Sequence, residues 1–173
     1  MPSPLGHALA GLATGFLVAG RGSQPDRGPR WLGRLEGQAV LLAAVACAPD
    51  LDLIVGTHNG PTHSIGAAVL AGLAVFAWTR STRLAVAVAA AYSSHVLLDW
   101  FNQDDSPPLG VMALWPFSRE HFMSPWPLLP AVSRRYWLPG FWWHTFKVAL
   151  LELAVFGTFA AVVWWRRVRT RST

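Results

Sequence analysis

The sequence predicts an all-α membrane protein, a single domain over residues 1–173 in which about five transmembrane helices form a bundle with a long outer-face loop. Hydrophobic residues make up 53% of the chain and charged residues only 13%, whereas soluble domains carry roughly 25% charged residues. The mean hydropathy is +0.33. Ten tryptophans, several near the ends of apolar runs, are typical of the aromatic belts at membrane interfaces.

Five apolar runs are expected to be the helices, because most of them approach the roughly 17–25 residues that span a bilayer, although the first is slightly short. Pro49 marks the expected end of the second run, since the residue before a proline avoids the helical region. Thr62 is expected to cap the third run. The segment 102–146 is rich in Pro and Trp and has no clear period, so we expect a loop at the membrane surface. The predicted helices are Leu5–Ala19, Gln38–Ala48, His63–Trp78, Leu84–Phe101 and Val148–Trp165.

The net charge of +5 comes almost entirely from arginines that stand between the apolar runs. This distribution indicates membrane topology, and we do not expect nucleic-acid binding. The arginines of the loop 21–34, of the connection at Arg80 and Arg83, and of the segment after the last run predict a cytoplasmic C-terminus and an outer N-terminus. Cys47 is the only cysteine, so an intramolecular disulfide and a cysteine-based zinc site are both excluded.

His95 and Asp99 are the most informative pair of the sequence. Residues four apart lie on one face of a helix, one turn from each other. An imidazole and a carboxylate are costly to bury unpaired inside an apolar helix. Two interpretations follow from the pair alone: a structural hydrogen bond that ties helices together, or two ligands of one metal ion.

The predicted topology brings further histidines and acids to the outer end of the helices. Such a set without cysteine suits zinc, manganese or iron, and it is large enough for two ions that share a carboxylate. Paired ions generate hydroxide at neutral pH and clamp phosphate oxygens. The sequence therefore favours hydrolysis of a phosphoester through metal-activated water, with a lipid or lipid-linked headgroup as substrate. The residues expected to converge are His7, Asp50, Asp52, His58, His63, His95, Asp99 and Glu152.

Four motifs carry a resemblance to a known family. They are Pro49-Asp50-Leu51-Asp52, the run His-Asn-Gly-Pro-Thr-His-Ser at 58–64, His-Val-Leu-Leu-Asp at 95–99 and Leu-Trp-Pro-Phe-Ser at 114–118. Together with the early His7, they resemble the membrane-bound, metal-dependent hydrolases of the YdjM-like type, which are LexA-regulated inner-membrane proteins of bacteria. Asn59 stands where that family commonly has an arginine, and the link before the Trp-Pro-Phe segment is longer here.

That family is in turn similar to the mostly helical group of zinc-dependent phospholipase C and P1 nuclease. The third zinc of this group is not expected here, because Val148 stands four residues after His144 in place of a glutamate. By the resemblance, His58 is a ligand or a phosphate contact, and Glu152 is a ligand or a general base. Glu152 is alternatively an interfacial acid paired with Lys147 or His144. The metal ligands that the resemblance implies are His7, Asp50 or Asp52, His63, His95 and Asp99, with Asp99 bridging two zinc ions.

Two classes of function stay open at this point. The first is a multi-pass enzyme of the bacterial inner membrane, with its active site on the outer face, and with the bilayer and a lipid substrate as its partners. The second is a non-enzymatic membrane protein, either a metal-binding structural protein or an ion or proton carrier. A carrier needs ionisable groups at several depths, and the cytoplasmic halves of the predicted helices offer almost none.

Overall fold

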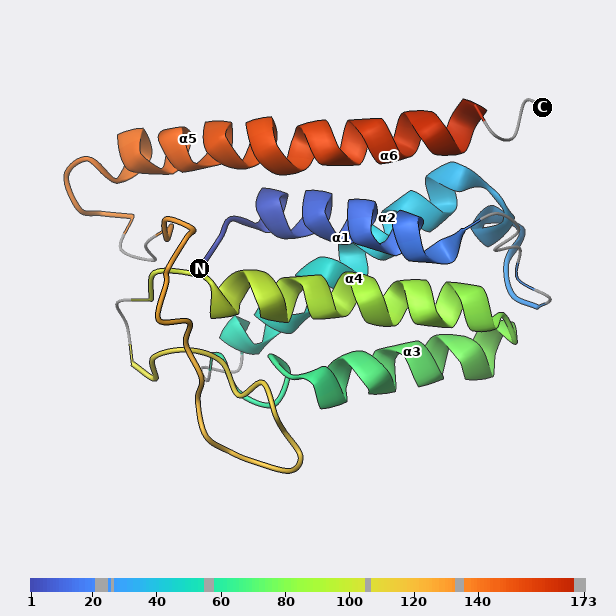
Figure 1. The fold of residues 1–173 in the computed structure, drawn as a ribbon, viewed down its shortest axis with the longest axis horizontal. Helices are drawn as coiled ribbons and strands as arrows, with labels where there is room; N and C mark the ends of the chain where they lie inside the picture. Colours follow the sequence, from blue (N-terminus) through green and yellow to red (C-terminus); the bar gives the residue numbers. More distant parts are fainter. Residues whose placement is uncertain (21–24, 26, 55–57, 105–106, 133–135, 170–173) are drawn as a thin grey trace.

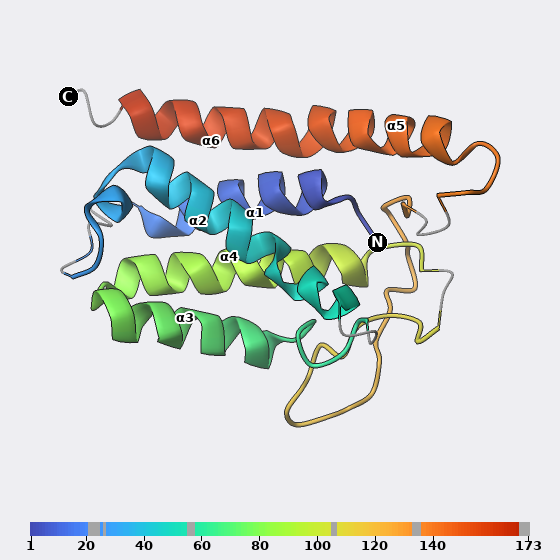
Figure 2. The same ribbon diagram turned by 180° about the vertical axis from the view of Figure 1, so that it is seen from behind.

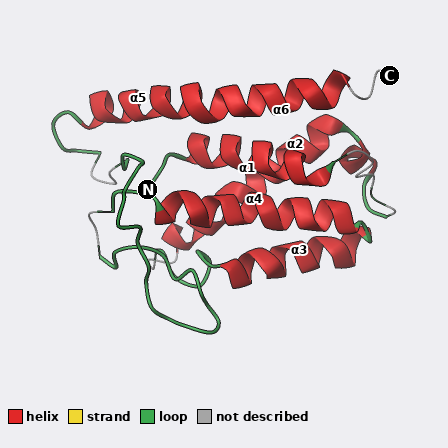
Figure 3. Ribbon diagram, viewed as in Figure 1, coloured by secondary structure: helices red, strands yellow, loops and turns green. Residues whose placement is uncertain are grey.

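The computed structural model describes residues 1–20, 25, 27–54, 58–104, 107–132 and 136–169. These residues form helices joined by loops (Figure 1, Figure 3), and their β pairing is confined to two isolated bridges, Asn102–Leu129 and Val111–Phe122. The prediction of an all-α fold is therefore confirmed. The elements are α1 (Pro4–Ala19), η1 (Arg30–Gly33), α2 (Leu35–Cys47), η2 (Ala48–Ile54), α3 (Ile65–Thr79), α4 (Thr82–Trp100), α5 (Phe141–Glu152), η3 (Leu153–Gly157) and α6 (Thr158–Arg169).

Serine side chains begin three of the helices. Ser3, Ser64 and Ser81 each accept a hydrogen bond from the backbone N–H three residues further along. They satisfy donors that the first turn of a helix leaves free. Ser64 is therefore the cap of α3, and the prediction of Thr62 as this cap was wrong. His63 consequently lies just before the helix and not in its first turn.

The last helix is longer than the sequence predicts. It begins at Phe141 rather than Val148 and runs through α5, the π-helical turn η3 and α6. Gly140 precedes it with φ of +80°, a conformation that glycine adopts without steric cost. The predicted loop at 102–146 therefore ends at residue 140. The tryptophans and phenylalanines at the start of α5 misled the prediction, because these residues suit both an interfacial loop and a helix.

The central helix of the bundle is α4. It packs against α1, α3 and α2, and α1 also packs against α6. Both views show α4 between α1 and α3, with α5 and α6 along the far side of α1 (Figure 1, Figure 2). Phe16, Leu42 and Ala91 belong to the core between these helices. A side chain at Gly11 would overlap Ala46, so this glycine allows α1 and α2 to approach closely.

Two stretches of the described chain are long and apolar enough to cross a membrane, Leu35–Ile54 with 20 residues and Phe141–Arg169 with 29. The prediction of about five spans is therefore supported for only two of the helices. With 16 and 15 residues, α1 and α3 are apolar but shorter than a usual span. The polar side chains of Arg83, His95 and Asp99 lie in α4 and make it less apolar. Parts of the arginine-rich loop 21–34 lie outside the described residues.

Five helix ends meet at one end of the bundle, on the left of Figure 1. There α1, α3 and α5 begin, and α2 and α4 end. The loop between α4 and α5 lies at the same end. The alternating direction of the helices thus brings together histidines and acids that are far apart in the sequence.

Candidate metal centre

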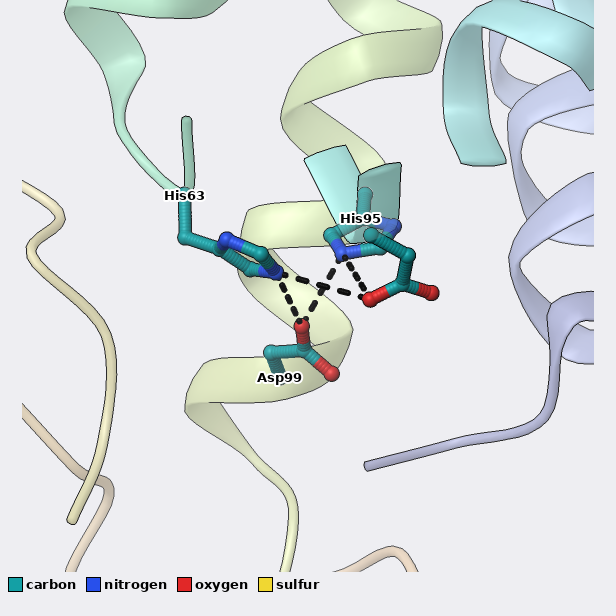
Figure 4. Close-up of side chains that lie close together, drawn as sticks. His63, His95 and Asp99 are labelled. Carbon is teal, nitrogen blue, oxygen red and sulfur yellow. Dashed lines mark ion pairs between the residues drawn. The ribbon is translucent and has the colours of Figure 1, made fainter. Parts of the chain in front are cut away.

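Four side chains form a compact group at this end of the bundle. Asp50 comes from η2. His63 directly precedes α3 and faces His95 and Asp99, which lie one turn apart on α4 (Figure 4). One nitrogen or oxygen atom of each residue lies within 4.8 Å of those of the other three. Nε2 of His95 lies 3.0 Å from Oδ2 of Asp99, and Nε2 of His63 lies 3.3 Å from the same oxygen. Both nitrogens also lie 3.6 Å from Oδ1 of Asp50.

The facing atoms of this group are buried and lack hydrogen bonds. His63 and His95 are 0% exposed and Asp99 is 4% exposed. In the described part of the chain, Nε2 of both histidines and both carboxylate oxygens of Asp50 and of Asp99 make no hydrogen bond. An unpaired buried polar group costs about 1–3 kcal/mol. A divalent cation would satisfy the nitrogen lone pairs and the carboxylate charges together, so the donor set fits a metal ion of the zinc type.

His7 extends the group from α1. Its ring is 0% exposed and stacks on the ring of His95 with 3.7 Å between centroids. Its Nε2 lies 3.5 Å from Oδ1 of Asp99, and neither of its ring nitrogens makes a hydrogen bond with another described residue. The two oxygens of Asp99 therefore face different histidines, Oδ2 towards His63 and His95, and Oδ1 towards His7. This arrangement suits a carboxylate that bridges two ions.

Asp52 lies behind His63 and holds its ring. Its Oδ2 is 3.1 Å from Nδ1 of His63 and accepts a hydrogen bond of 2.9 Å from the hydroxyl of Thr62. Its Oδ1 is 3.0 Å from Nδ1 of His58. These three residues, Asp52, His58 and His63, form a second group of ligand-type side chains. A carboxylate on the far nitrogen of a ligating histidine fixes the tautomer and the ring orientation.

The electrostatics of His63 follow from its surroundings. Burial alone would lower the pKa of its ring, because burial penalises the charged form. Its ion pairs with the carboxylates of Asp50, Asp52 and Asp99 outweigh this effect and raise the pKa to about 11. Without a bound cation, the three carboxylates therefore favour a proton on His63. A metal ion at this site would thus compete with a proton for the same ring.

Two further contacts position the centre. Nδ1 of His95 lies 2.7 Å from the carbonyl oxygen of Ala46, so this nitrogen donates and leaves the lone pair of Nε2 directed at the carboxylates. The hydroxyl of Tyr92 donates to the carbonyl of Thr62 at 2.8 Å and fixes the segment before His63. Sequence reasoning missed both contacts. Backbone carbonyls carry no residue-type signal, and Tyr92 and Thr62 are 30 residues apart.

Glu152 does not join this group. Its carboxylate accepts hydrogen bonds from the backbone N–H of Ser3, at 2.8 Å, and from the Ser3 hydroxyl. The predicted pairing with Lys147 or His144 was wrong. Nε2 of His144 instead lies 2.7 Å from the carbonyl of Ala131, and Lys147 lies 5.9 Å from the centroid of the Trp143 ring. The 4% exposed Glu152 thus joins the last helix to the start of α1, four residues before His7.

The described residues form a helical bundle with two helices long and apolar enough to cross a membrane, and at one end a buried histidine–aspartate group that could hold a metal ion. A model of the YdjM inner membrane protein family matches residues 1–170, and the chain belongs to this family. The resemblance carried by the four sequence motifs is thereby confirmed. A search of curated proteins and a search of solved structures each gave no match.

Proposed function

We propose that this chain is a metal-dependent hydrolase of the bacterial inner membrane that cleaves a phosphoester of a lipid or lipid-linked phosphate, with its active site on the outer face. The supporting observation is the convergence of buried imidazole and carboxylate atoms that lack hydrogen bonds. Histidine–carboxylate sets of this kind are typical of hydrolytic metal centres. These atoms belong to His7, Asp50, His63, His95 and Asp99.

These five side chains would hold two divalent ions, most simply zinc, with manganese or iron as alternatives. Asp99 is the shared ligand in this proposal, because Oδ1 lies near His7 while Oδ2 lies near His63 and His95. Bound in such a site, divalent ions supply Lewis acidity that activates water and polarises a phosphoryl oxygen. The proposed hydrolysis therefore requires all five of these side chains.

His58 is proposed to carry protons at the edge of the centre. Asp52 holds its Nδ1 at 3.0 Å, so Nε2 is the nitrogen left to take up or release a proton. Its ring lies 4.7 Å from the ring of His63, centroid to centroid, and thus next to the ligand set. Asp52 orients both rings. Glu152, predicted as a ligand or a base, is better placed to position α1 through Ser3.

The test is metal analysis of the purified full-length chain, together with a panel of phosphomonoesters and phosphodiesters. We expect stoichiometric divalent metal in the wild type, loss of metal in His95→Ala and Asp99→Ala, and loss of turnover with it. His121→Ala is the matched control, because His121 lies outside both groups of ligand-type side chains. A wild-type chain that binds no divalent metal, under conditions in which it is folded, overturns the proposal.

The near-complete burial of the centre favours one other function, that of a metal-binding structural membrane protein. The side chain of Asp50 is the most exposed of the five at 12%, and structural zinc sites are closed whereas catalytic sites keep an open position. Stoichiometric metal without turnover of any phosphoester would select this alternative. An effect of His95→Ala on stability alone would point the same way.

A further inference from the structure

Two adjoining apolar grooves lie beside the candidate metal centre. The first, of about 470 Å³, runs between the first two turns of α3 and the loop segment 113–117, and Val69 and Trp115 line it. The second, of about 280 Å³, lies between α3, the last turns of α4 and the same loop, and Leu97 lines it. Three residues line both grooves and form a shared wall, namely Ile65, Ala113 and Leu114.

The grooves and the centre share the same short stretches of chain. Ile65 follows His63 by two residues, and its N–H donates to the carbonyl of Ala113 at 3.0 Å, which fixes the wall against the start of α3. A side chain at Gly66 would overlap the carbonyl oxygen of Trp115, so this glycine lets the loop lie close to α3. Leu97 stands between the two α4 ligands in sequence and on another face of the helix. Both grooves therefore lie at the metal end of the bundle.

The lining of the grooves indicates hydrocarbon as the occupant. Among the described residues, no charged side chain lines either groove, and Ser93 is the only one in them with a hydroxyl group. Val69 is 50% exposed and Leu97 is 51% exposed, so the apolar surface is open to the surroundings of the protein. For a member of an inner membrane protein family, those surroundings include lipid chains. One lipid with two chains would fill two adjoining grooves with a common wall.

We propose that the two grooves bind the two acyl chains of a diacyl phospholipid, whose phosphate headgroup then lies at the histidine–aspartate centre. The proposal rests on the proposed function and narrows its substrate to lipids with two chains. A single-chain lipid phosphate, whether monoacyl or polyprenyl, would leave one groove without its occupant. The proposal therefore predicts that the protein prefers diacyl lipid phosphates to single-chain lipid phosphates, and this preference can be measured.

The first experiment needs no turnover. The full-length protein, in nanodiscs, is irradiated with a diacyl phosphatidic acid that carries a diazirine on its acyl chains, and the labelled peptides are identified by mass spectrometry. We expect label on α3 around Val69 and on α4 around Leu97. Val69→Trp should reduce labelling on α3 roughly tenfold, as expected when a side chain fills an apolar pocket. Val40→Trp is the matched control, an exposed helical valine outside both grooves.

The second experiment compares substrates on the metal-loaded protein. Val69→Trp and Leu97→Trp should each raise KM for long-chain phosphatidic acid roughly tenfold, and by much more than KM for a short, water-soluble phosphoester that does not reach the grooves. Turnover without label in the grooves, or equal turnover of monoacyl and diacyl substrates, overturns the two-chain proposal. Label in both grooves with no turnover of any ester supports the lipid site and contradicts the hydrolase.

Discussion

Oδ2 of Asp52 lies 3.1 Å from Nδ1 of His63, while Nε2 of the same ring faces the carboxylates of Asp50 and Asp99. One nitrogen of the ring thus faces the carboxylate that orients it, and the other nitrogen faces the carboxylates that would share a metal ion with it. Asp50 and Asp52 are two residues apart in the same short helix, η2, and lie on opposite sides of this imidazole. We therefore expect Asp52 to act as a positioning residue for His63.

Asp52→Asn should weaken metal binding without abolishing it. Removing a carboxylate that orients a ligating histidine typically costs 10–100-fold in metal affinity, roughly. Zinc titration against a competing chelator measures this effect, and circular dichroism checks the fold. Glu120→Gln, at an exposed acid, is the control. Unchanged affinity would contradict the positioning role, and a loss as complete as that in Asp99→Ala would make Asp52 a ligand.

His7→Ala should remove one ion and keep the other. Nε2 of His7 lies 3.5 Å from Oδ1 of Asp99, whereas Nε2 of His63 and of His95 lie near Oδ2 of Asp99 and also near Oδ1 of Asp50. We therefore expect half of the wild-type metal in His7→Ala and almost none in Asp99→Ala. Elemental analysis of the purified variants gives these ratios. Equal losses in the two variants would speak against a bridging Asp99.

Metal affinity should rise with pH. In the metal-free protein the pKa of the His63 ring, ordinarily 6.5, is raised to about 11, so at neutral pH a metal ion must displace a proton. Each proton released adds up to about tenfold in apparent affinity per pH unit. Calorimetry in buffers with different ionisation enthalpies counts the protons. A binding reaction that releases none would show that His63 is not a ligand.

The same pKa predicts how the metal-free protein responds to pH. A raised pKa means that the folded state binds the proton more tightly than the unfolded state does. The resulting stabilisation is complete below pH 6.5 and is lost as the pH rises towards about 11. Denaturant unfolding across this interval should show falling stability for the metal-free wild type. His63→Gln should remove most of the slope, and a slope of unchanged size would contradict the assignment.

Glu152→Ala should destabilise the start of α1 by about 1–3 kcal/mol, because the Ser3 hydrogen-bond donors lose their acceptor. Gly6→Ala should also destabilise, since its Cβ would lie 2.7 Å from the Glu152 carboxyl carbon. The two effects share one contact, so in the double variant they should sum to less than the separate losses. Gly60→Ala, where a Cβ meets nothing within 4 Å, is the control. Strict additivity would contradict the contact.

The grouping of His63, His95 and Asp99 could be predicted from the sequence. The i, i+4 spacing places His95 and Asp99 on one face of any helix, and the alternating arginine-rich connections predict which helix ends lie together. The separate positions of Asp50 and Asp52 could not be predicted, because they depend on the turns of η2. The partner of Glu152 could not be predicted either, since Ser3 is 149 residues away in the sequence.

The sequence predicted which segments form helices better than it predicted where each helix begins and ends. Ser64 and Thr62 are both good N-cap residues, and only the hydrogen bond to Ala67 selects the serine. The early start at Phe141 has no signal in an aromatic-rich segment. The number of membrane spans was also predicted less well. The polar side chains that form the candidate centre make α4 less apolar than a usual membrane-spanning helix.

The proposed sharing of the Asp99 carboxylate between two ions can be tested by spectroscopy. If paramagnetic ions such as cobalt(II) or manganese(II) occupied both proposed positions, a single O–C–O unit would connect them. Their unpaired electrons would then interact through that unit, and the resonance spectrum would differ from the sum of two isolated ions. Magnetic measurements could thus detect the bridge in a detergent-solubilised sample, before any substrate is known.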